Sequence, residues 1–235
     1  FVMDFLEGEV YWDHMLPSAS NEERIKIYQQ KNKVLANLHS VDYAAVGLES
    51  YGKPGNYVAR QVSRWTTQYL ASETESIPEM DKLIEWLPKN IPDDDETSIV
   101  HGDFRLDNMI YKNHEVIGVL DWELSTLGHP IADFSYHCLT WRTLPAMQDL
   151  KLLKELGIPS EVEYRDMYSE NTGKDLSKNW EFYMVFNIFK VAAICQGILG
   201  RVRDGTASNK HAEARGMQVF PLSAGAWSIV EANFK

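Results

Sequence analysis

The chain has few cysteines, fewer basic than acidic residues and no long apolar run. Its cysteines, Cys138 and Cys195, are too few for a disulfide framework, which indicates a reducing, cytoplasmic setting. Its 23 Lys and Arg against 34 Asp and Glu give a net charge of −11, which argues against a nucleic-acid partner. We find no signal-peptide pattern and no run predicting a membrane span. At 235 residues and 44% hydrophobic content, one large or two small globular domains are expected.

Polar side chains gather at the ends of short apolar segments between residues 99 and 123. The apolar segments predict three short strands, at residues 99–100, 109–111 and 116–120, the last two joined by a turn at 112–115. Asp103 and Asn108 would then lie on the loop between the first two strands. Asp121 would follow the third strand. The sequence therefore predicts oxygen-bearing side chains converging at strand ends, where a rigid scaffold commonly presents functional loops.

This set of side chains suits phosphoryl transfer. Such a site needs a carboxylate to receive the proton of the substrate hydroxyl, and oxygen ligands for magnesium ions. The alternative is that Asp103 and Asp107 only cap turns while Asn108 starts a strand. Turn chemistry gives no reason, however, for Asp121 and Glu123 to follow an apolar strand.

Three segments resemble the aminoglycoside phosphotransferase and choline kinase family of small-molecule kinases, which have a protein-kinase-like fold. They are His-Gly-Asp-Phe-Arg-Leu-Asp-Asn at 101–108, Leu-Asp-Trp-Glu at 120–123 and Gly-His-Pro-Ile-Ala-Asp-Phe at 128–134. His-Gly-Asp in place of His-Arg-Asp, and Asp-Trp-Glu in place of Asp-Phe-Gly, point away from protein kinases. Residues 60–65 resemble kinase-like proteins related to those fused to acyl-CoA dehydrogenases.

The resemblance implies a role for each matching residue. Asp103 would be the catalytic base, Asn108 and Asp121 would bind Mg²⁺, and Asp133 would brace the catalytic loop. Glu123 would hold a second Mg²⁺ or orient the first.

Two residues of the loop have open interpretations. His101 is either a general base or, as we favour, a scaffold for the loop. Arg105 either faces the transferring phosphate as a catalytic residue or is a surface arginine. Asp107 is expected to be a turn residue.

The first eight residues resemble the hinge between the two lobes of such kinases. In that interpretation the backbone of Asp4, Phe5 and Leu6 binds the adenine of ATP; the alternative is an ordinary opening strand. No Gly-x-Gly-x-x-Gly followed by a strand lysine occurs in the chain. We therefore expect a hinge strand at 1–8 and a kinase-like C-terminal lobe at 9–235, as a fragment of a longer kinase.

The expected fold class is α+β and mainly helical: the C-terminal lobe of a protein-kinase-like fold, with a small β-hairpin carrying the catalytic loop. Ser20 with Glu23 predicts a capping box at the start of the first helix. A kink is expected at Pro221 in the last helix. Helices are predicted at 21–40, 58–71, 79–89, 130–141, 148–155, 160–170, 178–203 and 209–234.

The predicted function is transfer of the ATP γ-phosphate to a hydroxyl of a small molecule, with Mg²⁺ and ATP as cofactors. The sequence does not identify the acceptor. The resemblance to proteins linked with acyl-CoA dehydrogenases implies a hydroxyacyl-CoA or another metabolite, and a polycationic antibiotic is the alternative. The oligomeric state is not predicted. The alternatives are a non-catalytic kinase-like binding module and a metal-dependent phosphohydrolase. Candidates to line the acceptor site, which core packing also explains, are Trp180, Tyr183, Asn187, Lys190 and Gln196.

Overall fold

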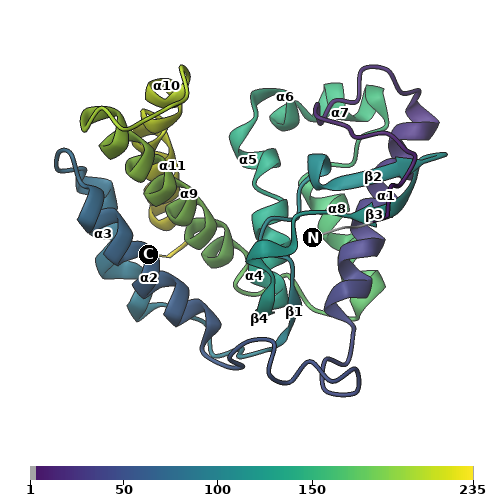
Figure 1. The fold of residues 1–235 in the computed structure, drawn as a ribbon, viewed down its shortest axis with the longest axis horizontal. Coiled ribbons are helices and arrows are strands. Elements are labelled where there is room, and N and C mark those ends of the chain that lie inside the picture. Colours follow the sequence, from purple (N-terminus) through teal and green to yellow (C-terminus); the bar gives the residue numbers. More distant parts are fainter. Residues whose placement is uncertain (1–3, 235) are drawn as a thin grey trace. The chain divides into compact units, whose positions relative to one another are not determined.

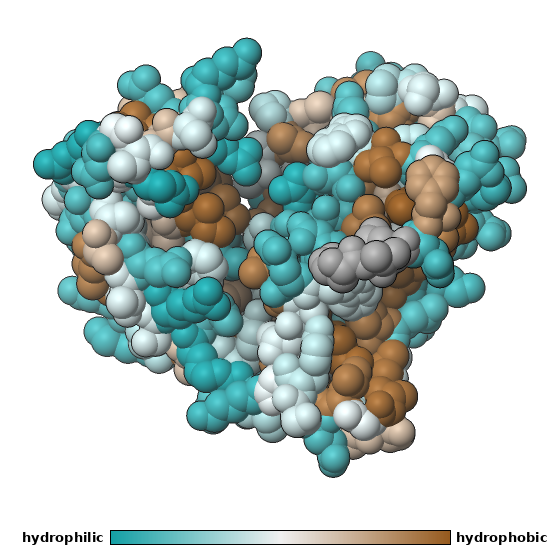
Figure 2. All heavy atoms as spheres, viewed as in Figure 1, coloured by the Kyte–Doolittle hydropathy of each residue, from teal (hydrophilic) through white to brown (hydrophobic). Residues whose placement is uncertain are grey.

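The structure is a computed structural model that describes residues 4–234 and divides into two compact units (Figure 1). Unit 1 comprises Phe1–Pro54 and Glu96–Lys178. Unit 2 comprises Gly55–Asp95 and Asn179–Lys235. Hydrophilic side chains cover much of the visible face, and apolar side chains are exposed in patches among them (Figure 2).

Unit 1 combines helices with all of the strands in the described residues. Its helices are α1 (Asn21–His39), α4 (Pro130–His137), α5 (Thr140–Thr143), α6 (Pro145–Gln148), α7 (Leu150–Leu156) and α8 (Glu161–Thr172). Its strands are β1 (Ser98–Val100), β2 (Met109–Lys112), β3 (Glu115–Val119) and β4 (Thr126–Gly128). The expected α+β, mainly helical fold with a small antiparallel hairpin is confirmed.

Helix α1 begins with the predicted capping box. The Ser20 backbone N–H donates to Glu23 Oε2 over 2.7 Å, and the Glu23 N–H donates to Ser20 Oγ over 3.3 Å. The helix buries Ile27, Tyr28 and Leu35, but also Lys31. The Lys31 ammonium lies 4.2 Å from the Tyr28 ring centroid, and burial lowers the pKa of Lys31 to about 7.

The strands form two antiparallel pairs. β2 pairs with β3, with Met109 opposite Val119, and β1 pairs with β4, with Val100 opposite Thr126. The hairpin turn is narrower than predicted: Lys112 pairs with Glu115, which leaves two turn residues. Both have positive φ, +52° and +65°, as a type I′ turn requires. Strand β4 was not predicted.

Unit 2 is helical in its described residues. Its elements are α2 (Tyr57–Ser72), α3 (Pro78–Trp86), a 3₁₀ turn at Leu87–Lys89, α9 (Trp180–Arg203), α10 (Ala212–Gly216) and α11 (Val219–Asn233). Helix α9 packs against α2, α10 and α11 (Figure 1). The length and composition of α9 would suit a membrane span, which the sequence analysis did not predict. However, 67% of its most apolar window is buried inside the protein. That burial is typical of a core helix.

The predicted last helix is divided, and the division does not lie at Pro221. Helix α10 ends at Gly216, and Pro221 lies in the first turn of α11. Proline is tolerated there because the first backbone N–H groups of a helix need no intrahelical acceptor. At Gly216 a Cβ would lie 2.9 Å from Leu199 Cα on α9. The backbones of α10 and α9 therefore approach closely at Gly216, where the predicted last helix is divided.

Candidate active site

The loop at 101–108 joins β1 to β2 and bends sharply at Gly102. Its φ is +83°, and a Cβ there would lie 2.7 Å from the carbonyl oxygen of Leu124. Both the backbone conformation and the close approach therefore require glycine. Glycine is therefore needed in His-Gly-Asp because it lets the loop pass close to the segment that follows Asp121.

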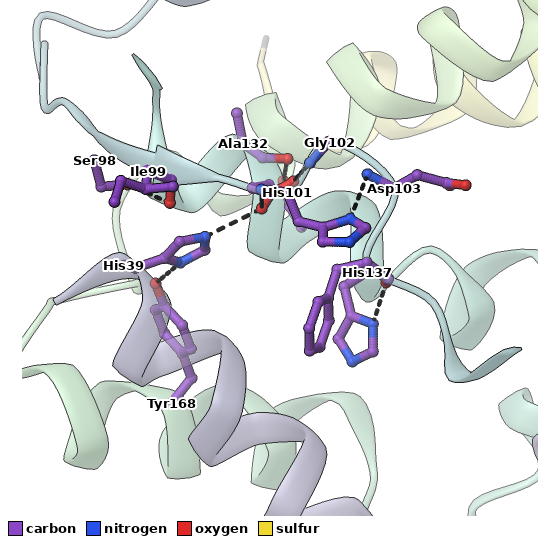
Figure 3. A network of polar contacts seen from close by, with 12 residues as sticks. His39, Ser98, Ile99, His101, Gly102, Asp103, Ala132, His137 and Tyr168 are labelled. Carbon is purple, nitrogen blue, oxygen red and sulfur yellow. Dashed lines mark hydrogen bonds and ion pairs between the residues drawn. The ribbon is translucent and has the colours of Figure 1, made fainter. Parts of the chain in front are cut away.

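Asp133 on α4 holds the start of this loop. Its Oδ2 accepts the backbone N–H of His101 over 2.8 Å, and its Oδ1 accepts that of Gly102 over 2.9 Å. His39 Nε2 lies 3.1 Å from Oδ2, and its Nδ1 lies 2.6 Å from Tyr168 Oη (Figure 3). With the proton assigned to Nε2, His39 donates to Asp133 and accepts from Tyr168.

The charge of Asp133 is stabilised despite its burial. Burial acts to raise the pKa of this carboxyl, but the hydrogen bond from His39 and the two backbone N–H groups outweigh it. The pKa of Asp133 is therefore held below its usual value. The carboxylate is built into the fold as a fixed acceptor for the loop.

Two further buried histidines hold the loop through its backbone. His101 Nε2 lies 2.8 Å from the Leu120 carbonyl oxygen, and its Nδ1 accepts the N–H of Asp103 over 3.3 Å (Figure 3). Both ring nitrogens of His101 are thus engaged with backbone groups. His137 Nδ1 lies 2.8 Å from the Phe104 carbonyl oxygen. Burial first, and then the charge of Lys31, holds the pKa of His137 well below its usual value, so this ring is neutral.

Asp103 and Asn108 lie in direct contact. Asn108 Nδ2 donates to the Asp103 backbone oxygen over 2.9 Å and to Asp103 Oδ2 over 3.3 Å. The amide nitrogen is therefore committed to Asp103. Tyr136 Oη donates to the other carboxylate oxygen, Asp103 Oδ1, over 3.2 Å. Asp103 is half-buried, with its side chain directed away from the buried histidines (Figure 3).

The strand register places Asp121 one residue beyond the backbone pairing of Leu120 with Asn108. The N–H of Leu120 donates to the Asn108 carbonyl oxygen over 2.8 Å, continuing the ladder of β2 and β3. Asp121 follows directly in the left-handed conformation, with φ +63° and ψ +56°. Its side chain is exposed and has no hydrogen-bond or ion-pair partner within residues 4–234. Glu123 is also exposed, in the 3₁₀ turn Trp122–Leu124.

Arg105 is paired with its neighbour Asp107. Its Nε donates to Asp107 Oδ1 over 3.0 Å, and a terminal nitrogen donates to Oδ2 over 2.7 Å. Burial acts to lower the pKa of Arg105, but this bidentate pair raises it above its usual value. The guanidinium is half-exposed, so the pair restrains the arginine at the surface of the loop.

The N-terminal segment runs beside the hairpin. Glu9 and Tyr111 exchange two backbone hydrogen bonds of 2.8 Å. Asp4, Phe5 and Leu6 are exposed and form no strand, with Phe5 91% accessible. Glu7 and Gly8 form no strand either, and residues 1–3 of the proposed hinge strand lie outside the described part of the chain.

The acceptor-site candidates on α9 are mostly buried within unit 2. Tyr183 Oη donates to Asp94 over 2.8 Å, and Gln196 Nε2 donates to the Ser72 carbonyl oxygen over 2.7 Å. The Lys190 ammonium lies 5.9 Å from the Trp65 ring centroid. Trp180 and Asn187 are also buried. Packing within unit 2 therefore accounts for much of this set.

Sequence reasoning missed several residues of the loop scaffold. The sequence does not reveal the contacts that His39, Tyr136, His137 and Tyr168 make around the loop. One signal was present: Tyr136 and His137 follow Asp133 by three and four positions, so a helix places all three on one face.

The chain matches the phosphotransferase enzyme family over residues 1–168. It belongs to that family, which confirms the resemblance seen at 101–108, 120–123 and 128–134. It is also 44% identical over 236 residues to acyl-CoA dehydrogenase family member 10 of Mus musculus. That match covers 97% of this chain and 22% of the relative. The chain thus spans about a fifth of the length of this relative.

Solved structures with the same fold include phosphotransferases. A protein from Ralstonia eutropha JMP134, provisionally assigned as an aminoglycoside phosphotransferase, superposes with a TM-score of 0.93 at 49% identity, covering 98% of this chain and 72% of that one. Spectinomycin phosphotransferase in complex with ADP and spectinomycin superposes with a TM-score of 0.56 at 14% identity. This second match covers 96% of this chain and 69% of that one, and shows the fold alone.

Proposed function

We propose that the protein transfers the γ-phosphate of ATP to a hydroxyl group of a small molecule. The observation that carries the proposal is the contact of Asp103 with Asn108, whose backbone pairs with Leu120, the residue before Asp121. In the transfer step Asp103 takes the proton of the acceptor hydroxyl. The acceptor oxygen bonds to the γ-phosphorus while the bond from that phosphorus to the bridging oxygen of ADP breaks.

The oxygen donors fit magnesium. The Asn108 amide oxygen and the unpaired carboxylate of Asp121 are hard ligands of the kind Mg²⁺ prefers, and Glu123 is a further carboxylate close along the chain. No cluster of three or more His, Cys, Asp or Glu residues able to hold a metal occurs in residues 4–234. Mg²⁺ commonly takes one or two protein ligands and completes its coordination with water and phosphate oxygens. When bound, the ion would neutralise charge on the transferring phosphate.

The remaining loop residues have supporting roles in this proposal. His101 is a scaffold, because its two ring nitrogens are engaged with backbone groups. Asp133 braces the loop from α4. Arg105 is held by its bidentate pair with Asp107, so we assign it a minor share of charge stabilisation.

The nucleotide would enter between the loop and the hinge. We propose that the backbone of Asp4, Phe5 and Leu6 binds adenine, as residues of a hinge segment 1–8 that leads into a kinase-like lobe at 9–235. The exposure of residues 4–6 leaves their backbone available to a ligand.

The acceptor that the relatives favour is a hydroxyacyl-CoA or a related metabolite of the cytoplasm. The support is the name of the mouse relative, an acyl-CoA dehydrogenase family member that matches 97% of this chain. The name of the Ralstonia protein supports an aminoglycoside as the second candidate.

The direct test is a transfer assay on the full-length natural protein. We expect label from γ-³²P-ATP to appear on a hydroxyacyl-CoA when Mg²⁺ is present, and not when it is chelated. Kanamycin and choline serve as competing acceptors. Mg²⁺-dependent release of inorganic phosphate without any acceptor would instead support a phosphohydrolase. Absence of both reactions, with ATP unbound by calorimetry, would support a non-catalytic binding module.

Arg105→Ala provides a graded test of the site. We expect kcat for transfer to fall by less than about tenfold, or about 1.4 kcal/mol of activation free energy, because the pair with Asp107 already occupies the guanidinium. Steady-state kinetics at saturating ATP measures this change. A loss of about a thousandfold would instead show that Arg105 contacts the transferring phosphate directly.

A further inference from the structure

One face of helix α4 contacts four consecutive residues of the catalytic loop. Asp133 accepts the N–H groups of His101 and Gly102, Tyr136 donates to the Asp103 carboxylate, and His137 contacts the carbonyl of the next residue. The three helix residues stand at positions i, i+3 and i+4, which share one face. Of these contacts, only that of Tyr136 is made to the side chain of Asp103.

A carboxylate on a short side chain needs such a contact to keep one orientation. Rotation about the bond that joins Cβ to the carboxyl carbon of aspartate is broad and nearly two-fold, so packing alone fixes it poorly. Here Oδ1 of Asp103 accepts from Tyr136 Oη over 3.2 Å, and Oδ2 accepts from Asn108 Nδ2 over 3.3 Å. Each oxygen therefore has its own donor, one from the helix and one from the loop.

Tyr136 is suited to act as a permanent donor. Burial first, and then the negative charge of Asp103, raises the pKa of Tyr136 above its usual value. The phenol therefore keeps its proton at neutral pH.

We propose that Tyr136 is a positioning residue for phosphoryl transfer, acting by fixing the rotation of the Asp103 carboxylate. This inference rests on the proposed function, in which Asp103 receives the proton of the acceptor hydroxyl. Tyr136 touches neither nucleotide nor acceptor in this proposal. Its removal should impair the chemical step and leave ground-state binding unchanged.

The test is Tyr136→Phe in the full-length protein, assayed with ATP and the acceptor identified by the transfer assay. We expect kcat to fall roughly 10- to 100-fold, the range associated with misplacing a catalytic group by about 1 Å. The KM values for ATP and acceptor should stay within about twofold, because the loss lies in the transition state alone. A change confined to KM, or an unchanged kcat, would overturn the proposal.

Tyr28→Phe is the matched control. Tyr28 is buried in the same unit, and its hydroxyl hydrogen-bonds to the His14 carbonyl oxygen over 2.8 Å and to Met147 Sδ over 3.9 Å rather than to a residue of the loop. Its loss should lower the melting temperature without changing kcat. A comparable loss of kcat in both variants would assign the Tyr136 effect to general destabilisation and so contradict the proposal.

A double variant separates this inference from the proposed function. In an Asp103→Asn background, Tyr136→Phe should cost no further activity, because the group it positions is already disabled. Loss of transfer in Asp103→Asn with full kcat in Tyr136→Phe would refute the positioning role alone. Full transfer in Asp103→Asn would refute the assignment of Asp103 as the base.

Discussion

Asp103→Asn in the full-length protein should lower kcat for phosphoryl transfer by roughly 10²- to 10⁴-fold, the range that a positioned general base contributes. Asparagine has almost the size of aspartate, and its oxygen still accepts one of the hydrogen bonds that Asp103 receives from Tyr136 and Asn108. An amide, however, does not take the proton of the acceptor hydroxyl. Steady-state transfer assays measure the loss, and calorimetric titration with MgATP should show that nucleotide binding survives.

The control for this prediction lies four residues further along the same loop. Asp107→Asn removes a charge whose described contacts are those with Arg105. The kcat of the Asp107→Asn variant should fall by no more than the tenfold limit expected for Arg105→Ala. Near-normal transfer by Asp103→Asn would remove Asp103 from the base role, and equal losses in the two variants would show that only the charge of the loop matters.

Local features of the fold were predictable because short stretches of sequence encode them. The capping box of Ser20 and Glu23 and the hairpin of β2 and β3 depend on neighbouring residues. The contact between Asp103 and Asn108 was predictable in the same way, since both residues lie on one loop between two strands.

Features that join distant segments were not predictable from periodicity. His39 and Asp133 are 94 positions apart, and Tyr136 is 33 positions from Asp103. Strand β4 pairs with the distant β1. With only three residues, it is too short to show the alternation of apolar and polar residues that predicts a strand. A buried polar side chain needs a partner, but the sequence does not say which one. The scaffold around the loop therefore became visible only in the structure.

Asp133→Asn should destabilise the protein by about 3–5 kcal/mol, as expected when one partner of a buried charge network is removed. Asparagine retains one acceptor, so the backbone N–H of His101 or of Gly102 loses its partner and meets an amide donor. Urea unfolding at neutral pH measures the change, with the m-value expected to stay constant. Asp166→Asn, on the exposed surface of α8, is the control and should change stability by about 0.5 kcal/mol or less.

The pH dependence of the stability difference between wild type and Asp133→Asn identifies the charge of Asp133 as the cause of that difference. The pKa of Asp133 is lowered in the folded state, so its contribution is complete above the unfolded pKa of about 3.9 and is lost as the pH falls through the folded value. The stability gap between wild type and Asp133→Asn should therefore be constant from about pH 7 to pH 5 and narrow below about pH 4. A gap unchanged at acid pH would assign the loss to side-chain shape, and the Asp133 carboxylate would then add no charge-dependent stability to the loop.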